Sequence, residues 1–343
     1  MKTPHFKRCS LLQARFPKVD DGFSMDTQCA RPPHLQSGSG SGWTGMWIFV
    51  LPFLLCANAF AGGNWLKLAK SAPDSVSFML LLSDGTVMAA NNPVDTFGEF
   101  GKKWYRLTPD PNGHYVLGEW STISSMTYVR HAFASKVLTN GMVFIAGGEH
   151  PVGGAGEASA EIYNPLTDQW TLINPPASMM DGTQVAPNLS PTRNQGFVDC
   201  NSSLLRNGNV LLAPEAPSVK NGTLIYDPRA NAWSNGPPTL AWQSEASWVG
   251  LPDGSILTVD HDSTSSERFI PALNRWIQDS DVQVNLWANM GPKVVGEIGP
   301  ALLLPNGKAF FLGGSGHTAI YTPSGSTNFG SWVAGPDIPN EKR

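Results

Sequence analysis

The sequence has 343 residues, among them 35 glycines, 28 prolines and 12 tryptophans, and only 15% of its residues are charged. This composition is typical of many short strands joined by tight turns, and it argues against long helices joined by salt bridges. The formal net charge of −4 and the lack of a Lys and Arg cluster after residue 62 argue against a nucleic-acid partner.

Residues 1–45 combine six basic residues with the run SGSGSG and show no apolar period. We interpret them as a disordered extension or as the product of a misassigned gene start. Three of the four cysteines, Cys9, Cys29 and Cys56, lie before residue 57. If the N-terminal segment is removed, only Cys200 remains, which excludes an intramolecular disulfide and a zinc site built from thiolates.

Residues 46–61 form an apolar run that ends in Ala59-Phe60-Ala61, the small-x-small pattern of a signal-peptide cleavage site. We predict cleavage before Gly62 and a secreted, periplasmic or cell-surface protein of residues 62–343. A membrane anchor over 46–61 is the alternative, but the run is shorter than the roughly 20 residues that a spanning helix needs. After cleavage we expect no stable membrane span.

One pattern then occurs five times. Each copy has an apolar strand, an Asp-Gly or Asn-Gly turn, a second apolar strand, and later an aromatic residue followed by a tryptophan. The turn glycines are Gly85, Gly141, Gly208, Gly254 and Gly307. The later pairs are Tyr105 and Trp120, Tyr163 and Trp170, Tyr226 and Trp233, Phe269 and Trp276, and Tyr321 and Trp332.

These turns predict two-residue hairpins, so each copy is expected to be a four-stranded antiparallel sheet. Such sheets bury both faces when they pack radially, with the tryptophans between neighbours. The sequence therefore predicts an all-β protein with a β-propeller fold.

The repeats resemble the kelch family, in its bacterial galactose-oxidase-like branch. The resemblance rests on VFIAGGE (143–149) with EIYNPLTDQW (161–170), on LIYDPRANAW (224–233) and on AFFLGGSGHTAIYTPSG (309–325). It covers residues 62–340 and implies a kelch-type propeller of four-stranded blades.

Residues 64–73, NWLKLAKSAP, are predicted to be an isolated fourth strand. Propellers commonly close by joining strands from both termini, so five blades and one strand predict a fragment of a six- or seven-bladed ring, incomplete at the C-terminus. A closed five-bladed ring that uses Trp65 elsewhere is the alternative.

Ionisable residues gather where the innermost strands begin and where the second strands end, two places on one face of a propeller. The predicted ligand-binding residues of this channel mouth are Arg130, His131, Glu149, His150, Asp199, Glu215, Glu245, Asp260, His261 and Glu297. They are suited to bind a cation, or to hydrogen-bond a sugar that stacks on Trp242 or Trp287. The other interpretation is that these groups cap strand ends and stay solvated.

We predict a monomeric binding module for glycans or protein partners, with no catalytic residues and no cofactor. The alternative is an enzyme on the same propeller. A radical-copper oxidase, which the resemblance implies, needs a Tyr–Cys cross-link, a second tyrosine and two histidines. Only Cys200 is left for it, and copper or another divalent cation is its possible cofactor. A carbohydrate isomerase or hydrolase would use Glu245 and Glu297 for proton transfer.

Overall fold

A computed structural model of the chain describes residues 65–91, 101–130, 133–148, 159–179, 200–214, 221–243, 246–260, 263–288 and 297–339. The chain divides into two compact units, Met1–Gly62 and Gly63–Arg343, and every described residue belongs to the second unit. The predicted extension 1–45 and signal peptide 46–61 therefore lie outside the described residues. No helix in the described ranges is long and apolar enough to cross a bilayer.

The second unit contains five four-stranded antiparallel sheets, which we call blades 1 to 5. This confirms the predicted all-β propeller. Blade 1 consists of β1 (Val76–Leu81), β2 (Val87–Asn91), β3 (Trp104–Thr108) and β4 (Glu119–Ile123). Blade 2 consists of β5 (Ala134–Val137), β6 (Val143–Ala146), β7 (Ala160–Asn164) and β8 (Gln169–Leu172). Blade 3 consists of β9 (Asn201–Leu204), β10 (Val210–Ala213), β11 (Thr223–Asp227) and β12 (Ala232–Gly236).

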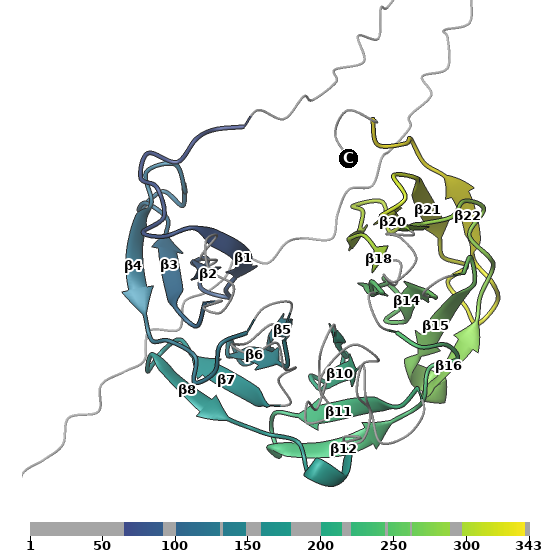
Figure 1. Cartoon of the computed structure of the whole chain (residues 1–343), viewed down its shortest axis with the longest axis horizontal. Coiled ribbons are helices and arrows are strands. Elements are labelled where there is room, and N and C mark those ends of the chain that lie inside the picture. The colour runs from purple at the N-terminus through teal and green to yellow at the C-terminus, as the bar shows by residue number, and fades with distance from the viewer. Residues whose placement is uncertain are drawn as a thin grey trace, which may run out of the picture. The chain divides into compact units, whose positions relative to one another are not determined.

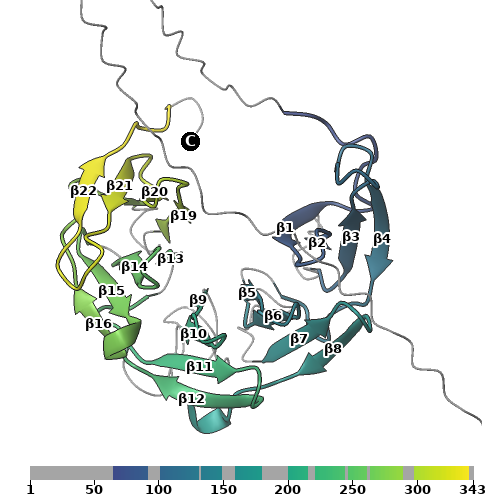
Figure 2. The ribbon, with the colours of Figure 1, turned by 180° about the vertical axis from the view of Figure 1, so that it is seen from behind.

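Blade 4 consists of β13 (Val249–Gly250), β14 (Ile256–Val259), β15 (Ser266–Ile270) and β16 (Arg275–Gln278). Blade 5 consists of β19 (Ala301–Leu303), β20 (Ala309–Leu312), β21 (Thr318–Thr322) and β22 (Ser331–Ala334). The first strand of each blade lies nearest the common axis and the fourth strand lies on the rim (Figures 1 and 2). The described residues also include a short pair, β17 (Trp287–Ala288) with β18 (Glu297–Ile298), and two single-turn 3₁₀ helices, Ala177–Met179 and Pro271–Leu273.

All five predicted hairpin turns form, and each depends on its glycine. Their φ angles lie between 79° and 89° at Gly85, Gly141, Gly208, Gly254 and Gly307. The turns contain three residues rather than the predicted two: the Gly85 N–H donates to the Leu82 carbonyl, and the Leu82 N–H donates to the Thr86 carbonyl. Only the glycine is left-handed, whereas the Asp or Asn before it accepts the N–H two residues on, as Asp84 does from Thr86.

Strands three and four of each blade carry the residues that pack against the preceding blade. The four predicted pairs from blades 2 to 5 lie directly opposite each other in register: Tyr163 and Trp170, Tyr226 and Trp233, Phe269 and Trp276, and Tyr321 and Trp332. In blade 1 the predicted residues also lie on strands three and four, but there Leu107 lies opposite Trp120, and Tyr105 lies opposite Thr122. Both aromatic residues are present there, but the pairing follows strand register.

The predicted isolated strand at 64–73 does not form in the described part of that segment. Residues 65–75 run irregularly beside the outer strand of blade 1, where the Ala69 N–H donates to the Val116 carbonyl at 2.8 Å. The Trp120 indole N–H donates to the Lys70 carbonyl at 3.2 Å. Trp65 itself is fully exposed and completes no blade.

Blades 1 and 5, the first and last of the described blades along the chain, each expose apolar side chains to solvent. On blade 5, Leu302, Phe310, Ile320 and Val333 lie opposite one another across all four strands, and Leu302 and Val333 are 46% and 51% exposed. On β1 of blade 1, Met79 and Leu81 are 59% and 63% exposed. The number of blades in the whole ring stays a prediction.

Candidate functional site

Most of the predicted channel-mouth residues fall outside the described ranges. These are His131, Glu149, His150, Asp199, Glu215, Glu245 and His261. The backbone of Glu297 lies in β18, where it pairs with Ala288. Arg130 and Asp260 are placed with their side chains, so they are the two members of the predicted site whose surroundings can be described.

Arg130 is buried and binds its own blade. Its guanidinium donates to the carbonyls of Gly147 and Ser159 at 2.8 and 3.0 Å, to the Ser159 hydroxyl at 2.6 Å, and to a Glu161 carboxylate oxygen at 2.9 Å. Neither Arg130 nor Glu161 exposes its side chain. A buried pair of this kind ties the loop before β5 to strand β7, and breaking it would leave an uncompensated charge.

Blade 4 repeats this arrangement without the arginine. Glu267 occupies in β15 the second position that Glu161 occupies in β7. The Glu161 carboxylate accepts the N–H groups of Thr127 and Tyr128, and Glu267 accepts those of Leu240 and Ala241. Three residues beyond Thr127 comes Arg130, and three beyond Leu240 comes Gln243, whose amide donates to Glu267 at 2.9 Å.

Glu267 also lies beside a second buried carboxyl group, that of Asp260. Burial raises the pKa of Glu267 to about 8, and the neighbouring Asp260 carboxylate raises it further, against the lowering effect of the Leu240 and Ala241 N–H donors. A pKa near 8 favours the protonated form of Glu267 at neutral pH. Perturbed carboxyl pairs are typical of functional sites, although structural networks produce them too.

A cavity of about 400 Å³ lies on the axis, between the innermost strands of all five blades. It is lined by Phe78, Leu80, Phe133, Ala134, Ser135, Lys136, Cys200, Asn201, Ser202, Ser247, Trp248, Pro300 and Ala301. We call it the central cavity. Its lining combines three aromatic rings with serine hydroxyls, one amide, one amine and one thiol, and none of these lining residues carries a carboxylate.

Hydrogen bonds connect the central cavity to the carboxyl pair. The Trp248 indole N–H donates to the Gln243 side-chain oxygen at 3.0 Å, and the Gln243 amide nitrogen donates to Glu267. The Thr258 hydroxyl also donates to the Gln243 oxygen, and the Asn201 amide donates to the Gln243 carbonyl. Gln243 is therefore the buried link between one wall of the cavity and the carboxyl pair.

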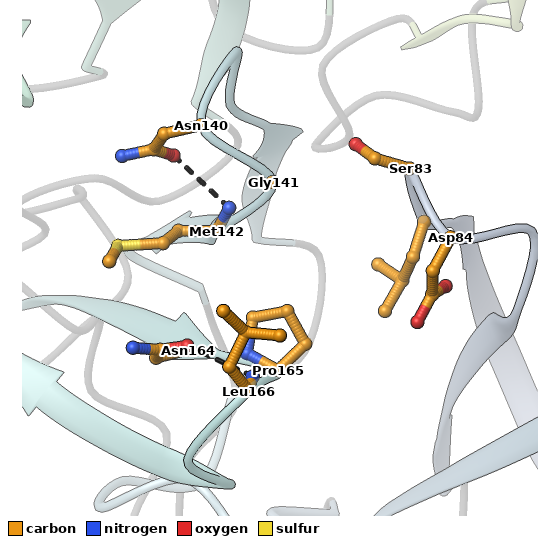
Figure 3. Close-up of a pocket in the computed structure, with 9 residues that line it drawn as sticks. Ser83, Asp84, Asn140, Gly141, Met142, Asn164, Pro165 and Leu166 are labelled. Atoms are coloured by element: carbon orange, nitrogen blue, oxygen red, sulfur yellow. Dashed lines mark hydrogen bonds between the residues drawn. The ribbon is translucent and has the colours of Figure 1, made fainter. Parts of the chain in front are cut away.

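A second pocket, of about 190 Å³, lies at the turns of blades 1 and 2. It is lined by Leu82, Ser83, Asp84, Asn140, Gly141, Met142, Asn164, Pro165 and Leu166 (Figure 3). Asn140 and Asn164 hold its two blade 2 turns by accepting the N–H groups of Met142 and Leu166. Leu166 is 94% exposed.

The predicted cation site finds no support among the placed side chains. Within the described ranges, no three His, Cys, Asp or Glu side chains come together as metal ligands would. The only described cysteine, Cys200, is a buried free thiol in the central cavity. The histidines of the predicted mouth, His131, His150 and His261, lie outside those ranges.

Comparisons with known proteins agree with this architecture. Residues 130–177 match the Kelch motif family. A solved structure, "Structure of YjhT", aligns with a TM-score of 0.50 and 14% identity over 73% of this chain and 75% of that chain. A fungal alcohol oxidase of the AA5 family, in complex with copper, aligns with a TM-score of 0.39 and 15% identity over 69% of this chain and 57% of that chain. No curated protein matches the sequence.

Five four-stranded blades around one axis define a β-propeller. Within this propeller, residues 130–177 carry a kelch motif, which agrees with the kelch resemblance predicted from residues 143–170. At 14% identity, the YjhT structure shows a shared fold and nothing about activity.

The sequence analysis missed the two buried glutamates and the polar inner strands. The sequence did contain a signal for the glutamates. The segments TYVR (127–130) and LAWQ (240–243) each begin with an N–H donor and end with the side chain that bonds the glutamate. In both blades the glutamate is the second residue of the third strand. The central cavity has no comparable signal. Its residues come from five separated segments that only the radial arrangement of the blades brings together.

We predict that Glu267 gives the protein a stability that falls as the pH rises. The folded state retains a proton that the unfolded chain releases above a pKa of about 4.5, so the stabilisation is complete below that pH and is lost as the pH approaches 8. In urea titrations between pH 5 and pH 9, Glu267→Gln should lose roughly 3 kcal/mol less than the wild type, because glutamine does not ionise. Parallel pH profiles for the two proteins would show that Glu267 keeps no proton.

The matched control is Glu161→Gln in blade 2. It leaves the buried Arg130 charge without its carboxylate and should cost about 3–5 kcal/mol at pH 7.

Proposed function

We propose that this kelch propeller is an exported binding module that holds a glycan in the central cavity. The observation that supports this most strongly is the composition of the cavity wall. Aromatic faces and hydrogen-bonding side chains converge there from blades 1 to 4, and sugars are bound by stacking combined with hydroxyl contacts.

Two hydroxyl groups of the wall are unused by the protein. Ser135 on β5 and Ser202 on β9 make no side-chain hydrogen bond within the described residues, and β5 and β9 are neighbouring strands. Trp248, by contrast, is held in place: its N–H bonds Gln243, and its ring lies 5.0 Å from that of Trp276. A fixed ring beside free hydroxyl groups suits a polyhydroxylated ligand.

The glycan part of the proposal predicts a binding loss for the double variant Ser135→Ala, Ser202→Ala. A glycan array finds the best ligand, and calorimetry then measures its affinity for each protein. Removing two hydroxyl groups that bond the sugar should weaken binding by at least about tenfold, since each hydrogen bond contributes about 0.5–1.5 kcal/mol. Leu166→Ser, in the pocket of Figure 3, is the control and should bind as the wild type does.

Two results would contradict a glycan site in the central cavity. One is an array without any ligand for the folded protein. The other is a ligand whose affinity the serine variant leaves unchanged.

A protein partner is the second candidate, and the exposed Leu166 is the observation that favours it. This side chain stands at the rim of a pocket whose wall includes Leu82, Met142 and Pro165, so an apolar side chain of a partner could fill it. In that case Leu166→Ser, rather than the serine variant, would weaken the complex.

Export is predicted from residues 46–61 alone. When the full chain is produced in a host with a general secretory pathway, N-terminal sequencing of the protein outside the cytoplasm should begin at Gly62. A protein that stays in the cytoplasm, or that keeps residues 46–61 and stays in the membrane, would contradict export by a cleaved signal.

A further inference from the structure

Lys136 occupies a position that the other blades fill with uncharged residues. It lies on innermost strand β5 opposite Phe144 of β6. The same register position is taken by Leu80, Ser203, Val249 and Leu302 in blades 1, 3, 4 and 5. Nothing in the blade architecture therefore requires an amine there, and its opposite residue, Phe144, is fully buried.

The amine of the partly buried Lys136 has no ion-pair partner among the described residues. Lys136 lines the central cavity and forms no hydrogen bond or ion pair within the described residues. The other titratable group among the residues that line the cavity is the thiol of Cys200, the residue before the neighbouring strand β9 of blade 3. Buried charges are usually paired, so an unpaired lysine favours its neutral form.

The surroundings of Lys136 favour the neutral form of its amine. Burial lowers the pKa of its amine, and the nearby Cys200 thiol opposes the shift only in part. A neutral amine is a nucleophile, whereas the ammonium group of an ordinary surface lysine at pH 7 is not.

We propose that Lys136 captures a small aldehyde or ketone in the central cavity as an imine, the open-chain form of a reducing sugar being the ligand class that fits the wall. This deepens the proposed glycan site and rests on it for the choice of ligand. The Nζ lone pair attacks the carbonyl carbon, and a C–N bond forms. The carbonyl oxygen takes up protons and leaves as water, and the nitrogen loses its two hydrogens as the C=N bond forms. No oxidant or reductant takes part.

The cavity provides the remaining requirements of this reaction. Ser135 and Ser202 place free hydroxyl groups in the same wall, where they can bond the carbonyl oxygen and the hydroxyl groups next to it. Phe133 and Trp248 provide the apolar surface that keeps the amine desolvated.

Reductive trapping tests the proposal with a probe that is not a glycan. The folded chain is treated at pH 7 with glycolaldehyde and cyanoborohydride, and peptide mass mapping follows the labelling of each lysine over time. Lys136 should react several-fold faster than the exposed Lys67 and Lys103, because a lowered pKa leaves more of its amine unprotonated at pH 7. Unfolding in urea should abolish the difference.

Two variants assign the reaction to the amine. Lys136→Arg keeps a cation of similar length but forms no reducible imine, so the fast phase should disappear. Cys200→Ala removes the thiol and should leave the fast labelling of Lys136 unchanged. The proposal is overturned if Lys136 reacts no faster than Lys67 and Lys103, or if the fast phase survives in Lys136→Arg or vanishes in Cys200→Ala. Glycolaldehyde labelling does not require glycan affinity. The labelling test can therefore fail while the glycan array finds a ligand, and the array can fail while Lys136 is labelled rapidly.

Discussion

The packing of one blade against the next is the constraint on which this structure depends. A four-stranded sheet has two faces, and a single blade cannot bury either of them alone. Each of blades 2 to 5 therefore presents a Tyr or Phe and a Trp to the blade before it, as when Tyr226 stacks on Phe144 with ring centroids 5.4 Å apart. The indole nitrogens add hydrogen bonds across the same boundary, from Trp170 to Ser124 and from Trp233 to Ile173. Position in the repeat, rather than local helix or strand preference, decides which residues are buried.

The site follows from this packing. Because the large side chains of the outer strands fill the space between the blades, the innermost strands are left to line a cavity on the axis with both aromatic and polar residues. The buried glutamates serve the same architecture by fixing the chain as it enters a blade. Glu161 does so with the charge of Arg130, whereas Glu267 does so with the neutral Gln243 and beside Asp260. One structural device therefore gives a neutralised ion pair in blade 2 and a carboxyl pair in blade 4, and only the second is linked to the cavity through Trp248.

Sequence reasoning predicted the blades well because their signals are local. The turn glycines and the aromatic pairs lie within single copies, and four of the five pairs match the observed register. In blade 1 the residue opposite Trp120 is Leu107 rather than Tyr105, because the spacing of aromatic residues alone does not fix register. The segment around Trp65 has the composition of a strand but forms none among the described residues. The central cavity was not predictable in this way, since Lys136, Ser202 and Trp248 are neighbours only in three dimensions.

The central claim, that burial between blades holds the fold, is tested most directly by one pair of substitutions. Phe144 and Phe310 occupy the same register position in blades 2 and 5, but blade 3 covers Phe144 completely while Phe310 lies in the partly exposed row of blade 5. By chemical denaturation, Phe144→Ala should lower the free energy of unfolding by about 3–5 kcal/mol, and Phe310→Ala should lower it by less than about half of that. Equal losses would show that the strands themselves, and not the contacts between blades, carry the stability.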